Sequence, residues 1–287
     1  MKTLILIAAS TLFTAVPAYA SPPQTYSRTI VTDRVTQQGA DDFNIRPGAA
    51  SSATSTVGAY KATATADFGV IKLSADAPDA NGFVQSTGYF RDTVTLSSTG
   101  AGGFVPVTMN FLVNGAATNY NPGVGEWAYG VILDLSGTDV NRFQYVSTDV
   151  RDFTSATGAF TRAITATGFA PAGVPLDITA VFSIYTSGNT FSAFNLDFAH
   201  TALLTGIAVG DGVTVTSATY GLLPTNAGQF TYGAVLRELN PGAPSAAVPE
   251  PASWALMIVG FGMVGSLMRS KRARAPNAAE RTIKASV

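Results

Sequence analysis

Apolar and polar residues alternate along much of this chain, and a period of two predicts β-strands with one buried face. Residues 176–184 show it most clearly, since every second residue from Leu176 to Ile184 is apolar and polar residues such as Asp177 lie between them. Residues 107–113 repeat the pattern, and residues 127–135 form a more continuous apolar run. No stretch between 21 and 240 has the pattern of a capped amphipathic helix. We therefore predict an all-β fold, an antiparallel β-sandwich of jelly-roll or Ig-like type.

Turn-forming residues separate the predicted strands at four places, which are Asn81-Gly82, Asn114-Gly115, Ser187-Gly188-Asn189 and Asp211-Gly212. We expect the last pair to join residues 207–209 and 213–215 in a tight hairpin. Residues 47–56, rich in Gly, Ala and Ser, are predicted to form a loop. Residues 21–46 are predicted to be an N-terminal arm or a first strand.

The first 20 residues have the order of parts of a secretory signal peptide. Lys2 precedes an apolar run over residues 4–9, and Ala18-Tyr19-Ala20 is an A-x-A cleavage site. We predict cleavage between Ala20 and Ser21 after export through the Sec machinery.

A second apolar segment lies near the other end of the chain. It contains Gly260, Gly262 and Gly265, spaced as in a dinucleotide-binding G-x-G-x-x-G, but the basic cluster that follows leaves no room for a second strand. Residues 251–268 carry no charge, and as a helix they would span about 27 Å, close to the ~30 Å hydrocarbon core of a membrane. The basic cluster predicts a cytoplasmic C-terminus by the positive-inside rule. It consists of Arg269, Lys271, Arg272 and Arg274.

Residues 249–274 resemble the PEP-CTERM sorting signal in its PEPxxWA form. The resemblance rests on the uncharged helix with its glycines, on the basic cluster, and on Pro249, Glu250, Pro251, Trp254 and Ala255. It implies export in a Gram-negative bacterium that makes exopolysaccharide. It also implies an exosortase that recognises Pro-Glu-Pro and removes the anchor, so that a protein first held in the inner membrane reaches the cell surface or the medium. Residues 275–287 extend past the usual end of such signals.

These segments define the expected organisation: a signal peptide at 1–20, an exported sandwich at 21–239, a Pro-rich linker at 240–248, the sorting signal at 249–274 and a cytoplasmic tail at 275–287. The charge distribution agrees. Residues 21–248 carry ten Lys and Arg against sixteen Asp and Glu, whereas residues 269–287 carry six against one. An acidic exported part argues against nucleic acid as a partner. The chain has no cysteine, which excludes disulfides and thiolate metal sites.

Few residues suggest chemistry. His200 is the sole histidine, and Asp197, three positions away in a strand, is expected to point to the opposite face. A loop with Asp76, Asp79 and Asn81 is the best candidate for calcium, although an Asx-rich turn is the favoured interpretation. Glu126 beside Trp127 could serve a glycosidase, but a loop Glu next to a core tryptophan is favoured.

No catalytic constellation emerges, so we predict a protein that is not an enzyme. The leading hypothesis is an exported surface or extracellular-matrix protein associated with exopolysaccharide. Two alternatives stay open at this point: a secreted carbohydrate-active enzyme of jelly-roll type, and a surface adhesin or assembly subunit.

The signal peptide gives the first testable prediction. N-terminal sequencing of the exported protein should begin at Ser21, because Ala18 and Ala20 supply the small side chains that signal peptidase requires. Recovery of an exported form that still begins at Met1 would contradict this.

Overall fold

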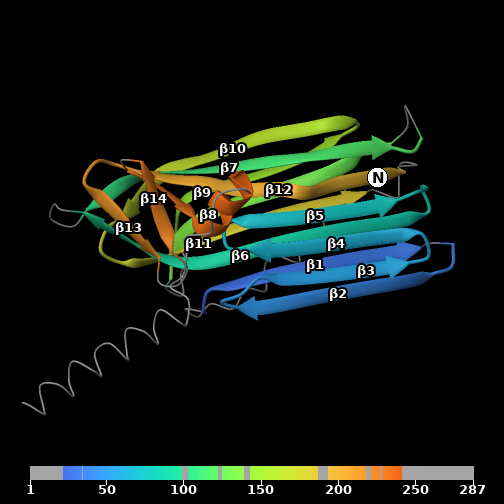
Figure 1. Cartoon of the computed structure of the whole chain (residues 1–287), viewed down its shortest axis with the longest axis horizontal. Coiled ribbons are helices and arrows are strands. Elements are labelled where there is room, and N and C mark those ends of the chain that lie inside the picture. The colour runs from blue at the N-terminus through green and yellow to red at the C-terminus, as the bar shows by residue number, and fades with distance from the viewer. Residues whose placement is uncertain are drawn as a thin grey trace, which may run out of the picture. The chain divides into compact units, whose positions relative to one another are not determined.

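Alternating side chains produce two antiparallel β-sheets that pack face to face (Figure 1). The computed structural model describes residues 22–33, 35–98, 103–121, 125–138, 143–186, 193–217, 221–226 and 228–240. The chain divides into two compact units, Met1–Asn240 and Pro241–Val287, and every described residue belongs to the first. The predicted signal peptide, linker and sorting signal therefore lie outside the described residues, apart from Asn240 at the start of the linker.

Sheet A has seven strands in the order β2-β1-β6-β11-β8-β9, with β13 also paired to β6. Its strands are β1 (Gln24–Asp33), β2 (Gln38–Pro47), β6 (Gly82–Ser98), β8 (Trp127–Gly137), β9 (Gln144–Thr154), β11 (Pro175–Thr186) and β13 (Val213–Ser217).

Sheet B has eight strands in the order β10-β7-β12-β5-β4-β3, with β15 paired to β12 and β14 paired to β15. Its strands are β3 (Ser51–Val57), β4 (Tyr60–Asp67), β5 (Val70–Ala77), β7 (Phe104–Asn119), β10 (Gly158–Pro171), β12 (Phe194–Val209), β14 (Leu222–Asn226) and β15 (Gln229–Tyr232). A short helix, α2 (Gly233–Leu239), ends this unit. The all-β antiparallel sandwich predicted from the sequence is confirmed.

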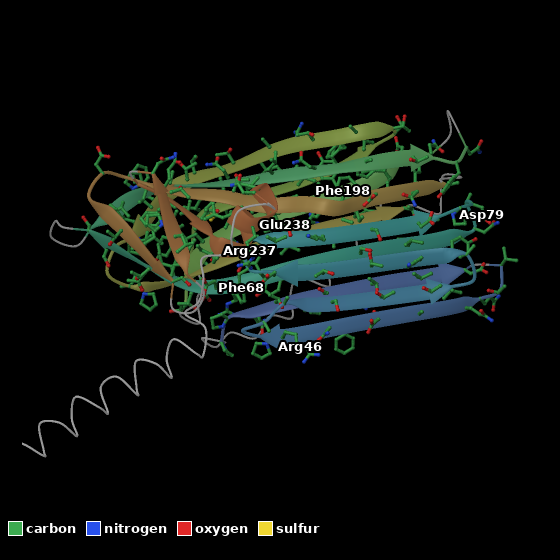
Figure 2. The ribbon with its side chains drawn as sticks, in the orientation of Figure 1. Arg46, Phe68, Asp79, Phe198, Arg237 and Glu238 are labelled. Carbon is green, nitrogen blue, oxygen red and sulfur yellow. The ribbon has the colours of Figure 1, made fainter. Side chains whose placement is uncertain are left out.

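Aromatic side chains fill the interior on one side of the sandwich. Trp127 of β8 packs against Phe160 and Phe198, at ring-centroid distances of 5.2 and 5.5 Å. Phe182 of β11 also lies 5.6 Å from Phe198, which Figure 2 places midway along the strands. Rings of this size keep the two sheets apart while burying a large apolar area.

Small side chains fill the interior on the other side, where β1 faces β3 and β4. The inward residues of β4 include Ala62, Ala64 and Ala66, all at most 1% exposed. The hydroxyls of Ser27 and Ser51, one from each sheet, lie 2.9 Å apart. Buried hydroxyls therefore satisfy one another across the sandwich, which keeps their burial from being destabilising.

The edge strands of the two sheets meet in pairs. β2 continues into β3 through residues 48–50, and its side chains bond to the backbone of β3. Asn44 Nδ2 donates to the Ser52 carbonyl at 3.1 Å, and Asp42 Oδ2 accepts from Thr54 N at 2.8 Å. These bonds occupy groups that a free edge would present to another chain.

The β9 and β10 edge is closed by a close approach instead of side-chain bonds. A Cβ atom placed on Gly168 of β10 would lie 2.5 Å from the Tyr145 carbonyl oxygen of β9. Only glycine allows the two strands to approach this closely.

Several local predictions were wrong. Residues 51–56, expected in a loop, belong to β3, and Asn114-Gly115, expected to separate two strands, lies inside the continuous strand β7. Asp211-Gly212 does form a turn, but it leads from β12 in sheet B to β13 in sheet A and does not close a hairpin. The expected turn at Asn81-Gly82 is present between β5 and β6, whereas residues 187–189 lie outside the described residues.

In the described part of the chain, α2 is seven residues long and no helix reaches the length and hydropathy needed to cross a membrane. The predicted span at 251–268 is not among these residues.

Two strand glycines give a matched test of the packing. A Cβ at Gly115 would lie 2.3 Å from Phe198 Cδ1 and 2.7 Å from the Asp197 carbonyl, whereas a Cβ at Gly130 would meet nothing closer than 3.8 Å. We expect Gly115→Ala to lower the free energy of unfolding by about 1–3 kcal/mol through overpacking. Gly130→Ala should raise it by up to about 1 kcal/mol, because glycine weakens a strand. Urea denaturation measures both, and equal midpoints for the two variants would contradict the packing described here.

Candidate functional site

The residues proposed for sorting and cleavage lie outside the described part of the chain. This applies to Ala18, Ala20 and Ser21, and to the whole motif from Pro249 to Arg274. The candidate site in the described part must therefore be sought in the sandwich.

His200 and Asp197 lie in β12 at an irregular point. The pairing register of β12 shifts between Phe198 and Ala202 against β5, and between Asp197 and Thr201 against β7. Asp197 Oδ1 accepts a hydrogen bond from Ala199 N at 3.0 Å and so stabilises this bulge. The simple alternation assumed for the pair does not apply across a bulge. The side chain of His200 is outside the described set.

The candidate calcium loop is an Asx turn between β5 and β6. Asp79 Oδ1 accepts from Asn81 N at 2.7 Å and from the Tyr60 hydroxyl at 2.5 Å, while Asp76 Oδ1 accepts from the Tyr120 hydroxyl at 3.0 Å. Burial, followed by the bond to Asp79, raises the pKa of Tyr60 well above its ordinary value. Figure 2 places Asp79 at the extreme end of the strands. Among the described residues, no three His, Cys, Asp or Glu side chains gather as a metal site would require.

Trp127 cannot serve as a sugar platform, because it is fully buried. Its Nε1 donates to the Ala156 carbonyl at 2.9 Å. The sequence analysis favoured a core tryptophan beside Glu126, and the structure confirms it. Glu126 is therefore not paired with an exposed tryptophan.

A buried acid that the sequence analysis overlooked joins three strands. Asp92 of β6 is 0% exposed, and its Oδ2 accepts from Ser217 Oγ of β13 at 2.6 Å and from the Tyr232 hydroxyl of β15 at 3.0 Å. The Tyr232 ring lies 5.7 Å from that of Phe90. This Asp92 cluster connects segments that are 140 residues apart, and its role is structural. The clue in the sequence is an acid at an inward position, in phase with Phe90 and Val94.

A second buried acid corrects a prediction. Asp177, expected on a wet face, is 1% exposed and bonds Arg91 Nη2 at 2.5 Å through Oδ2. Its Oδ1 accepts from Thr93 Oγ1 at 3.1 Å.

The last helix of the unit is fixed to the sandwich by packing and by an ion pair. Lys72 Nζ of β5 lies 2.6 Å from Glu238 Oε1 of α2. Gly69, at φ +82°, leaves space that the side chains of Tyr232 and Val235 occupy. The chain therefore leaves the sandwich from a defined point before the linker.

Exposed aromatic rings gather at the end of the sandwich where β7 begins and β10 ends, next to β13 and β14 (Figure 1). We call Phe104, Phe143, Tyr145 and Phe169 the aromatic end patch. Its three phenylalanines are 64–65% exposed. Tyr145 lies 6.1 Å from Phe104 and 5.1 Å from Phe143 between ring centroids. Exposed apolar groups that cluster in this way mark interaction surfaces. Sequence patterning does not predict this patch, because the four residues come from three separate strands or their flanks.

Comparisons with known proteins assign the C-terminal segment. Residues 247–272 match the PEP-CTERM protein-sorting motif, which confirms the resemblance. The match includes Pro249-Glu250-Pro251 and ends before Arg274. No curated protein matches the chain. A chain of broad bean stain virus aligns with 72% of this chain and 93% of its own length, at 10% identity and a TM-score of 0.20, which is too low to inform the fold or the function. The motif marks an exported protein that an exosortase sorts.

The Asp92 cluster generates a pH prediction. Burial, then the charge of Asp92, raises the pKa of Tyr232 well above its ordinary value. A folded pKa above the unfolded one means that stability is complete below about pH 10 and declines as pH rises further. Tyr232→Phe should lower stability at pH 7 by about 1–3 kcal/mol, because a bond to a carboxylate is lost. It should also make the alkaline decline shallower.

Ser217→Ala is the matched control for this experiment. It removes the other hydroxyl bond to Asp92 Oδ2 without removing a titrating phenol. We expect it to lose stability at pH 7 but to retain the wild-type decline above pH 10, as measured by urea denaturation at several pH values. An unchanged alkaline decline in Tyr232→Phe would contradict the assignment.

Proposed function

Because the chain carries a PEP-CTERM sorting motif, we propose that it is a non-catalytic protein of the cell surface or extracellular matrix, associated with exopolysaccharide. It leaves the cytoplasm through the Sec machinery and is held in the inner membrane by residues 251–268. An exosortase then releases it. The sorting motif is the single observation that carries this proposal.

The composition of the exported part supports a non-catalytic role. The chain offers one histidine and no cysteine for nucleophilic or general-base chemistry. In the glycosidase alternative, Trp127 beside Glu126 was the candidate sugar platform, and this side chain is buried. The two acids buried in the sandwich, Asp92 and Asp177, are bonded to strands and side chains that hold the fold together.

The chemistry of the motif explains how an enzyme could recognise it. Pro249 and Pro251 restrict the backbone to an extended form and remove two amide donors. Glu250 is then a single carboxylate on an extended peptide just outside the uncharged segment. Such a peptide suits a protease cleft, whereas a simple anchor needs only apolar length and basic flanks.

Glu250→Ala tests the sorting step. In a host with the matching exosortase, we expect wild type to lose its C-terminal segment and Glu250→Ala to stay uncut and membrane-bound. Mass spectrometry and membrane fractionation measure the two outcomes.

Glu280→Ala is the control, because it removes the same side chain from the tail beyond the matched motif. It should be processed like wild type. If all three proteins keep residues 252–287 and remain in the membrane, the chain is an ordinary single-span protein and the proposal fails.

A further inference from the structure

The aromatic end patch is the surface of the described sandwich best suited to bind a ligand. Phe104 and Phe169 point outward from sheet B on neighbouring strands, since Phe104 pairs with Pro171 and Phe169 pairs with Pro106. Diagonal neighbours of this kind lie about 7–8 Å apart, within reach of aromatic rings. Tyr145 and Phe143 continue the row onto sheet A.

The closed edge between the sheets places the strands that carry Phe169 and Tyr145 next to each other. Gly168 allows the backbone of β10 to approach the Tyr145 carbonyl, and Phe169 is the next residue along that strand. The ring contacts within the row are tilted, at 56° and 60°. Ring surface therefore stays open to solvent, as the exposure of all three phenylalanines shows.

Among the described residues, few charged side chains lie around the patch, and Asp139 and Arg142, in the segment before Phe143, lie outside them. The described strand ends and turns on this side comprise residues 95–98, 103–108, 135–138, 143–147, 166–176, 206–217, 221–226 and 228–231. In these ranges Asp211 is the single charged residue, and Thr and Ser are frequent. The opposite end of the sandwich carries Asp76, Asp79 and Glu126. The frequent Thr and Ser side chains of these ranges suit a ligand rich in hydroxyl groups.

We propose that the aromatic end patch binds the faces of neutral hexose rings in a polysaccharide, an inference that rests on the polysaccharide association proposed above. One face of a pyranose presents C–H groups with partial positive charge, and the face of an aromatic ring is negative. Stacking therefore needs no formal charge. The equatorial hydroxyls of the sugar remain free to bond the surrounding Thr and Ser side chains.

The test is affinity electrophoresis of the exported protein in gels that contain the host's purified exopolysaccharide, a neutral β-glucan or anionic polygalacturonate. We expect retardation by the first two. The double variant Phe104→Ala/Phe169→Ala should bind at least about tenfold more weakly, because it removes two exposed rings. Binding should change little between low salt and about 0.5 M NaCl, since screening acts only on charges.

Phe43→Ala is the matched control, because Phe43 is also 64% exposed but lies on β2, outside the patch. It should bind like wild type. All three side chains involved in these variants are far from buried, so circular dichroism and urea midpoints should match wild type and show that folding is unaffected.

The outcomes separate the site from the function. If wild type and the double variant bind the polysaccharides equally, the patch is refuted while the polysaccharide association stands. If wild type is sorted normally but no polysaccharide retards it, the polysaccharide association is refuted. The proposal that the aromatic end patch binds hexose rings is then refuted as well. If light scattering shows a wild-type dimer that the double variant abolishes, the patch is a contact between copies and the proposal is overturned.

Discussion

The gap between the two sheets is set by the size of the side chains that they turn toward each other, and the other features of the sandwich depend on this. Beside β1, alanine, serine and threonine let the sheets approach until Ser27 and Ser51 share a hydrogen bond across the interior. Beside β8 and β11, rings such as Trp127 and Phe182 fill a wider space. Interiors are close-packed, so neither kind of filling can replace the other without cavities or clashes.

The size of the inward side chains also determines how the edge strands of the two sheets meet. On the side of small residues, β2 comes near enough to β3 for Asp42 and Asn44 to bond its backbone. On the other side, β9 and β10 meet only because residue 168 lacks a side chain. Closed edges matter because an exposed strand edge presents free backbone groups to another copy of the chain. The chain also has no cysteine and therefore no disulfide to stabilise the fold. The fold relies instead on packing and on buried polar links such as the Asp92 cluster.

Period-two patterning predicted the all-β class and strands such as β11, because burial acts on each residue locally, but it missed β3 and the burial of Asp177. It could not predict which strands pair. Asp211-Gly212 has the chemistry of a hairpin turn, yet Val213 pairs with Ser98, more than a hundred residues earlier. The same limit applies to the candidate site. Asp92 could have been found from its inward phase, but the aromatic end patch depends on which strand ends meet, and that is a property of the whole topology.

Closed edges and exposed rings together restrict how this protein can make contacts. With the Ser52 carbonyl and the Thr54 amide of β3 already bonded by side chains of β2, a partner that approaches this edge finds fewer free backbone groups. The side chains of the aromatic end patch are neutral rings, and each ring contributes only a small stabilisation. Weak contacts of this kind hold a compact ligand poorly. A polymer of repeating units offers the same contact many times, so dissociation from one unit is followed by rebinding to the next. A surface built in this way suits retention in a matrix more than capture of a small molecule, and under the proposed function that role belongs to the sandwich, separate from the sorting motif that delivers it.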